Sequence, residues 1–163
     1  MPCQNVEGFT DPIEGYSPEE LNDAAITVFG ELAGRFNEKS REEAEAIASI
    51  IFNRSTAIAN GTAPGSLWGS SSSLSDVVGA PSQFAGFNAG KEIIQTGVEF
   101  DEGQRNCNRL QTAGSAIAWL AGHPEARKPY LYMCAKGHVT TPHPDDVTIN
   151  GNVFSTQPLG CVP

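Results

Sequence analysis

The chain has 163 residues, of which 39% are hydrophobic and 18% are charged; this balance excludes a disordered chain and fits one domain with a buried core. The net charge of −9, with no basic patch, argues against nucleic acid and anionic membrane surfaces as partners. No apolar run is long enough to cross a bilayer, so membrane insertion is not expected either.

Residues 1–16 are polar and are expected to be irregular, and the first five lack the basic and apolar segments of a signal peptide. The sequence Ser17-Pro18-Glu19-Glu20 then forms a capping box, with proline at the first helical position. It predicts a helix that runs to about Leu32. Apolar residues recur along this helix at the spacing of one face: Leu21, Ala24, Ala25, Val28 and Leu32.

Glu31 stands beside this apolar face, at the end of the predicted helix. A carboxylate at the edge of a core is partly desolvated, which disfavours its charged form and raises its pKa, as a general acid requires. Gly30 and Gly34 flank it and allow another backbone or a substrate to approach closely. The alternative is a solvated glutamate in the last turn of a helix.

A second capping box at Ser40–Glu43 follows a polar loop at 34–39 and predicts another helix. Glu42, Glu45 and Ser49 form its polar face, and Asn53-Arg54 falls late in it. Its core positions are Ala44, Ile47, Ala48, Ile51, Phe52 and Ile58.

Beyond the second helix the pattern is weaker. Residues 60–73 are rich in glycine and serine and predict a loop, and 74–78 predict one short helical turn. We expect exposed backbone with two aromatic residues over 81–87, a short helix over 89–96 and a firmer helix over 104–121.

The last part of the chain predicts strands. Pro129–Met133 has the composition of a strand, and Val147–Ile149 and Asn152–Phe154 flank Asn150-Gly151, which suits a tight hairpin turn. The expected fold is therefore α+β, mainly α, with a small β-hairpin element, in a single domain over 1–163.

Four cysteines are widely spaced, without the spacing of a zinc site. Cys3 and Cys161 lie near the two termini, which are often close in space, so the favoured pairing is Cys3–Cys161 with Cys107–Cys134. Four reduced thiols remain the alternative. His138 and His143 are not at helical ligand spacing, so no metal and no cofactor are expected.

Several of these motifs occur in one order over residues 24–155: Gly30 to Gly34, the helix ending in Asn53-Arg54, Gln83-Phe84, Tyr130-Leu131-Tyr132 and the hairpin Ile149 to Phe154. This order resembles the cell wall hydrolase family of the spore cortex-lytic enzyme SleB. The resemblance implies a lysozyme-like domain that acts on peptidoglycan glycan strands.

The resemblance also implies roles for individual residues. Glu31 matches the catalytic glutamate of the family. Glu42 matches the glutamate that opens its second helix and is the candidate second catalytic carboxylate, which orients a water or hydrogen-bonds near Glu31; the alternative is a first-turn glutamate that complements the helix dipole. Asn53, Gln83, Phe84 and Tyr132 match motif positions that are expected to bind the sugar. Cleavage then proceeds either by attack of water or by attack of the muramyl 6-hydroxyl, which gives an anhydro product.

The sequence departs from the family pattern after Glu31, where Leu32 and Ala33 replace alanine and arginine. This departure keeps a second hypothesis open, a peptidoglycan-binding module without catalysis. A third is a peptidoglycan amidase that uses Cys107 or Cys134 with a histidine. The acidic charge is also compatible with an antibacterial toxin that acts in the periplasm or cell wall and is neutralised by a basic immunity protein.

Overall fold

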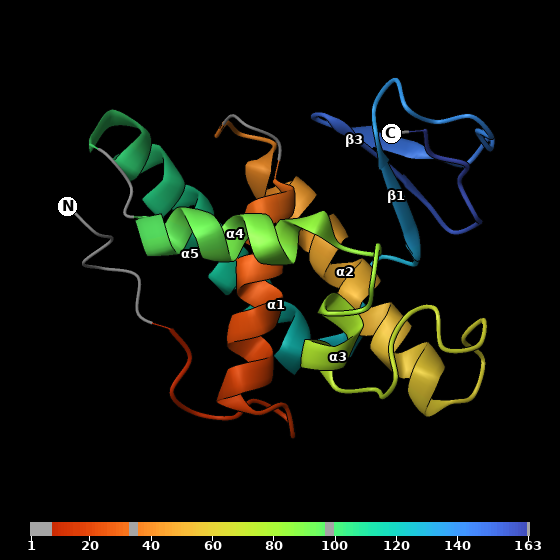
Figure 1. Ribbon diagram of the computed structural model, residues 1–163, viewed down its shortest axis with the longest axis horizontal. Helices are drawn as coiled ribbons and strands as arrows, with labels where there is room; N and C mark the ends of the chain where they lie inside the picture. Colours follow the sequence, from red (N-terminus) through yellow and green to blue (C-terminus); the bar gives the residue numbers. More distant parts are fainter. Residues whose placement is uncertain (1–7, 33–35, 97–99, 163) are drawn as a thin grey trace.

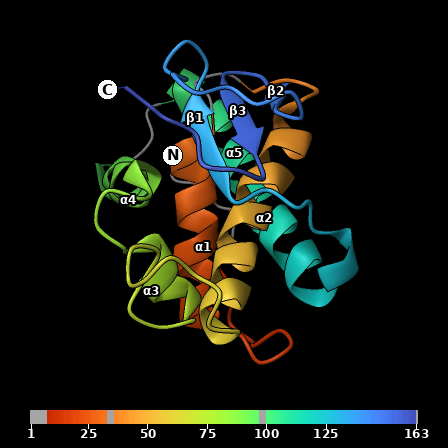
Figure 2. The ribbon, with the colours of Figure 1, turned by 90° about the vertical axis from the view of Figure 1, so that its right-hand side faces the viewer.

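The structure is a computed structural model that describes residues 8–32, 36–96 and 100–162, and it confirms an α+β chain that is mainly helical. Its helices are α1 (Pro18–Glu31), α2 (Ser40–Ala59), α3 (Leu74–Val78), α4 (Ala85–Thr96), α5 (Phe100–Gly122) and the short 3-10 helix η1 (Pro124–Ala126). Its strands are β1 (Tyr132–Ala135), β2 (Val147–Ile149) and β3 (Asn152–Ser155). The helices form one body, and the sheet lies at one end of it (Figures 1 and 2).

Helix α1 begins as predicted. The Ser17 hydroxyl accepts a hydrogen bond from Glu20 N at 3.2 Å, and the Glu20 carboxylate accepts one from Ser17 N at 2.9 Å. The predicted apolar face is buried at every position, including Leu32 just past the helix end. Local capping and the apolar stripe therefore determine the place and orientation of this helix.

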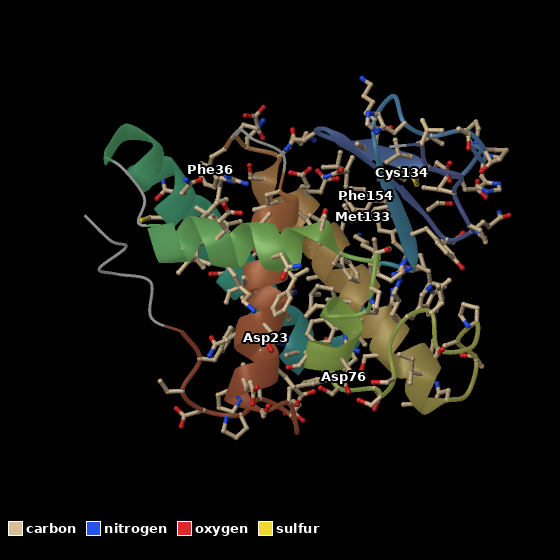
Figure 3. All side chains as sticks on the ribbon, viewed as in Figure 1. Asp23, Phe36, Asp76, Met133, Cys134 and Phe154 are labelled. Carbon is tan, nitrogen blue, oxygen red and sulfur yellow. A yellow bond between two sulfur atoms is a disulfide. The ribbon has the colours of Figure 1, made fainter. Side chains whose placement is uncertain are left out.

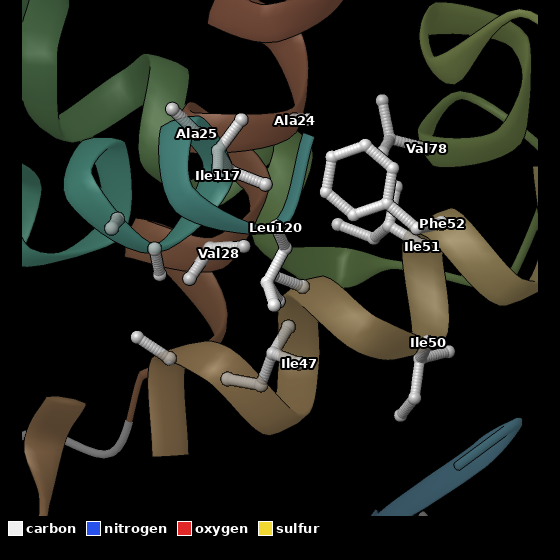
Figure 4. Close-up of a cluster of buried hydrophobic side chains, with 14 of the residues drawn as sticks. Ala24, Ala25, Val28, Ile47, Ile50, Ile51, Phe52, Val78, Ile117 and Leu120 are labelled. Carbon is white, nitrogen blue, oxygen red and sulfur yellow. The ribbon is translucent and has the colours of Figure 1, made fainter. Parts of the chain in front are cut away.

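Helix α2 lies at the centre of the core, where Ile47, Ile51 and Phe52 meet residues from α1, α3 and α5 (Figure 4). Of its predicted polar face, Glu42 is exposed and Glu45 is partly exposed, whereas Ser49 is buried. Glu43 and Arg54 of the same helix are buried as well. Ser40 is also not the N-cap: it is the first helical residue, and its hydroxyl accepts a hydrogen bond from Asn37 N at 2.9 Å.

Helix α4 lies across α1 (Figure 1) and begins four residues earlier than the predicted 89–96 helix. The prediction of exposed backbone over 81–87 was wrong from Ala85 onward, and Phe84 is buried. Gly86 and Gly90 weaken the helical signal of this segment, but they face α1, where a Cβ at Gly90 would collide with the Ile26 carbonyl. Tertiary packing here outweighs local propensity.

The sheet has the strand order β1-β3-β2 and is antiparallel. The predicted hairpin is confirmed: Ile149 pairs with Asn152 across the turn, and Asn150 takes a left-handed φ of 52°. Met133 and Phe154 pair across β1 and β3 on the side toward the helices (Figure 3), and Phe154 is fully buried. Strand β1 begins three residues later than predicted.

The predicted cysteine pairing was wrong, because Cys134 bonds to Cys161 with their Cα atoms 6.0 Å apart. Cys107 is also disulfide-bonded, and Cys3 lies outside the described residues. Cys134 stands in β1, so the bridge ties the C-terminal segment to the sheet. Within the described ranges, no helix has the length and apolar character needed to cross a membrane.

Candidate active site

Glu31 is the last residue of α1, at the point where the amino end of α4 meets that helix (Figure 1). Its side chain is half-buried. The backbone N–H of Gly86, the second residue of α4, donates a hydrogen bond of 2.7 Å to Oε1 of Glu31. The carboxyl group therefore lies against a neighbouring helix and is not in open water.

Burial raises the pKa of Glu31 above its ordinary value, and the hydrogen bond from Gly86 opposes this with a smaller effect. At any pH near the titration range, more of Glu31 is protonated than of a solvated glutamate. The direction agrees with the expectation from the sequence. A protonated carboxyl that accepts on Oε1 carries its proton on Oε2, where it can be donated.

Gly30 lets α1 and α4 approach each other closely. This close approach was predicted from the place of Gly30 beside Glu31 in the sequence. A Cβ on Gly30 would collide with the Gly86 carbonyl, and a Cβ on Gly86 would lie 2.7 Å from Glu31 N. Contacts this short require backbone to move, so both positions need glycine. The second predicted glycine, Gly34, lies outside the described residues.

A second carboxylate, Glu43, lies close to the backbone of Glu31. It is fully buried in the first turn of α2. Its Oε2 accepts a hydrogen bond from Asn152 Nδ2 at 2.9 Å, and its Oε1 accepts one from Asn150 Nδ2 at 3.5 Å. Asn152 Nδ2 also lies 3.4 Å from the Glu31 carbonyl oxygen. The hairpin thus joins Glu43 to the end of α1.

The sequence interpretation chose Glu42 in place of Glu43. Glu42 is exposed and forms an ion pair of 3.4 Å with Lys39, and the two side chains are 53% and 59% exposed. Glu42 also faces Tyr130, whose pKa is raised first by burial and then by the charge of Glu42. Helical periodicity could have indicated the burial of Glu43. This residue stands four positions before Ile47, so both lie on the buried face of α2.

The other predicted site residues meet around Arg54, which is 5% exposed. Arg54 Nη1 donates to Gln83 Oε1 at 2.9 Å. The guanidinium carbon lies 5.3 Å from the Phe84 ring centre and 5.7 Å from the Tyr132 ring centre. The structure therefore brings Gln83, Phe84 and Tyr132 together, but about a cation that the sequence interpretation gave no role.

The Arg54 cluster, which comprises Arg54, Trp68, Gln83, Phe84 and Tyr132, is a packed unit. Trp68 completes it, with its ring centre 4.9 Å from the guanidinium carbon. Burial lowers the pKa of Arg54 to about 10, against a smaller opposing effect of Tyr132, so the side chain keeps its charge at neutral pH. Phe84 is buried, and one face of its ring is covered by the guanidinium.

The side chain of Asn53 holds the backbone segment just before β1. Its Nδ2 donates to the Lys128 carbonyl at 2.7 Å and to the Tyr130 carbonyl at 2.9 Å. These carbonyls precede β1, and their bonds to a side chain explain why that strand begins later than predicted. Asn53 and the Arg54 cluster together hold the backbone that leads into β1. Gln83 and Phe84 directly precede α4, whose second residue is Gly86.

A pocket of about 590 Å³ lies at the opposite end of α1 from Glu31. It is lined by Glu14, Gly15, Tyr16, Glu20, Ser55, Thr56, Ala59 and Ser71–Ser73. Neither Glu31 nor Glu43 lines this pocket, so it is separate from the candidate site. Glu20 there accepts hydrogen bonds from Ser17 N and Leu74 N.

Cys107 and Cys134 are both disulfide-bonded, which leaves neither of them as a thiolate nucleophile in this oxidised form. Among the described side chains, no group of three His, Cys, Asp or Glu residues converges as metal ligands do. No protein-family model matches the chain, and neither curated proteins nor solved structures gave a match.

Proposed function

We propose that the chain cleaves the glycan strands of peptidoglycan, as a muramidase or a lytic transglycosylase with a lysozyme-like fold, and that Glu31 is its general acid/base. The observation that carries the proposal is the environment of Glu31, a half-buried carboxyl with a raised pKa whose backbone is joined to the buried Glu43 by Asn152. Pairs of carboxylates in unlike environments are typical of glycosidic bond cleavage.

In this mechanism Glu31 gives its proton to the glycosidic oxygen as the bond breaks, and the sugar develops oxocarbenium character. Glu43, which accepts hydrogen bonds from two amides, is the second carboxyl group that we propose for the site, near the end of α1. Deprotonated Glu31 then takes a proton from water or from the muramyl 6-hydroxyl, as the oxygen that loses the proton forms a bond to the anomeric carbon. The first route is hydrolysis and the second is transglycosylation.

The test compares wild type with Glu31→Gln on purified sacculi, with released muropeptides identified by mass spectrometry. Gln keeps the acceptor for Gly86 N but has no acidic proton, so we expect turnover to fall about 10²- to 10⁴-fold. Glu19→Gln is the matched control, because Glu19 is an exposed glutamate of the same helix. Full activity of Glu31→Gln would show that the mechanism is wrong, and binding of wild type without any products would indicate a binding module.

Reducing-end products would identify hydrolysis, and anhydromuramyl products would identify transglycosylation.

The disulfide is compatible with action in the periplasm or outside the cell. The biological role we propose is that of an antibacterial toxin with a basic immunity partner, to which the net charge of −9 is suited.

A further inference from the structure

Asn152 occupies an unusual place, because one side-chain amide serves both carboxylate-bearing helices. It is the first residue of β3, pairs with Ile149 and Ala135 in the neighbouring strands, and is 8% exposed. Its Nδ2 lies 2.9 Å from Glu43 Oε2 and 3.4 Å from the Glu31 carbonyl oxygen. Both neighbours are acceptors, so the amide is oriented with its NH₂ group toward them.

The hairpin turn reinforces this arrangement. Asn150, at the turn, reaches Glu43 Oε1 at 3.5 Å and exchanges hydrogen bonds of 3.2 and 3.3 Å with Asn37, which precedes α2. Glu43 therefore has an amide donor for each oxygen, and both donors come from one hairpin. A carboxylate held in this way has a defined position relative to Glu31.

We propose that Asn152 is a positioning residue, which fixes the Glu43 carboxylate relative to the end of α1 that carries Glu31. The inference rests on the proposed function, since positioning has a consequence for turnover only if the two carboxylates act on a glycan. Asn152 acts through Glu43 and Glu31 and does not itself react. Positioning requires a hydrogen-bond donor at position 152, and a side chain of the same size without a donor is not sufficient.

The experiment uses Asn152→Asp, which keeps the size of the side chain but replaces the donor with an acceptor that faces Glu43. We expect kcat on sacculi to fall on the order of 100-fold with little change in KM, as small displacements of catalytic groups do. The added carboxyl group also raises the pKa of its neighbours. The alkaline limb of the kcat profile and the ¹³C NMR titration of the Glu31 carboxyl are therefore expected to move to higher pH. Gln157→Glu, at an exposed position shortly after β3, is the control for the charge change.

A purely structural role predicts a different result, namely a kcat profile that is scaled down without displacement, and this result would overturn the proposal. So would an Asn152→Asp variant that behaves like Gln157→Glu. If Asn152→Asp does not fold, the double variant Asn152→Asp with Glu43→Gln restores a donor–acceptor pair of opposite sense. We expect it to fold but to keep a low kcat, because the carboxyl group has moved away from position 43, whereas recovery of full turnover would overturn the proposal.

Failure of the proposed function can be recognised separately. If wild type releases no muropeptides, the glycosidase proposal fails. The NMR titration then still decides whether Asn152 fixes the position of Glu43 relative to Glu31. Displacement of the Glu31 titration by Asn152→Asp and not by Gln157→Glu shows that position 152 lies near the Glu31 carboxyl. The positioning role is supported if the titration also moves in Asn152→Leu, which removes the donor at nearly constant size and adds no charge. Absence of any displacement contradicts it.

Discussion

Glu31 and Glu43 show how one end of a helical body gives two glutamates different environments. Glu31 loses water on one side and gains one backbone hydrogen bond, from Gly86. Glu43 loses water on all sides and gains amide donors from the hairpin. Burial with a single backbone donor favours the protonated form of Glu31. This environment favours Glu31 for the acid role in the proposed mechanism.

The raised pKa of Glu31 makes folding stability depend on pH. A folded-state pKa above the unfolded value means that the folded protein binds the proton more tightly, so stability is greatest at low pH and is lost as pH rises through the folded pKa. Glu31→Gln removes this loss. We expect Glu31→Gln to melt at a higher temperature than wild type at pH 7, and the difference to shrink toward pH 4.

Thermal unfolding followed by circular dichroism at both pH values measures this difference. Glu19→Gln serves again as the control and is expected to show no gain at pH 7, because Glu19 is exposed in the first turn of α1. A melting temperature for Glu31→Gln that is equal to or below wild type at pH 7 would contradict the raised pKa.

Arg54 is the second residue whose chemistry can be tested by a conservative change. Its planar guanidinium donates from Nη1 to Gln83 Oε1 and from Nε to the Leu131 carbonyl, each at 2.9 Å. Lysine is a point charge and cannot reproduce both bonds together with the ring contacts. Arg54→Lys therefore leaves a partly buried acceptor without its donor, which costs about 1 kcal/mol of unfolding free energy or more.

Urea unfolding measures that loss, with Arg41→Lys as the matched control on the same helix. Arg41 forms a partly exposed ion pair with Glu45, so its replacement is expected to change the unfolding free energy by less than about 0.5 kcal/mol. Equal effects of the two substitutions would mean that the Arg54 cluster does not stabilise the fold.

At the scale of elements, the crossing of α1 and α4 positions Glu31. Glycines make this crossing possible, because Gly90 lies against the Ile26 carbonyl and Gly86 against Glu31. We expect Gly90→Ala to destabilise the protein by about 1–3 kcal/mol, since the added methyl group meets backbone. Gly114→Ala in α5 is the matched control, because nothing lies within 4 Å of its Cβ position.

Gly114→Ala is expected to stabilise the protein by about 0.5–1 kcal/mol, as alanine is the better residue inside a helix. Opposite signs for the two Gly→Ala changes in chemical denaturation support the close crossing. If both variants are more stable than wild type, the helices are not packed backbone to backbone.

The sequence predicts best those elements whose local signals agree with their packing. The capping box at Ser17, the apolar stripe of α1 and the Asn150-Gly151 turn are of this kind. The start of α4 could not be predicted, because Gly86 and Gly90 reduce helix propensity and are required by the partner helix. Strand β1 was shifted because Asn53 binds the carbonyls of Lys128 and Tyr130, which lie far away in the sequence.

The surroundings of the candidate residues were predictable to a similar extent. The partial burial of Glu31 followed from its place beside a clear apolar stripe. Glu43 was missed because a glutamate in a first helical turn is usually solvated, and its burial depends on amides of a distant hairpin. The grouping of Gln83, Phe84 and Tyr132 followed from motif order, but the central place of Arg54 depends on three-dimensional packing alone.

At the scale of the whole molecule, the sheet is held to the helical body by polar contacts such as that of Asn152 with Glu43 and by the core residues Ile149 and Phe154. The C-terminal segment is held in turn to the sheet region. Val139 and Cys161 form a β-bridge, and Val162 N donates to the His138 carbonyl at 2.9 Å. The Cys134–Cys161 bond closes this loop, with a sequence separation of 27.

Removal of that bond by Cys134→Ala with Cys161→Ala frees the unfolded chain and should lower the unfolding free energy by about 3 kcal/mol, from the entropy of closing a loop of this length. Urea unfolding followed by tryptophan fluorescence measures the loss without touching the disulfide of Cys107. The hairpin carries Asn150 and Asn152, so loosening the sheet also loosens the hold on Glu43. An unfolding midpoint and a turnover both equal to wild type would mean that the tail is held by its backbone hydrogen bonds alone, and that the hairpin keeps the carboxylates in place without it.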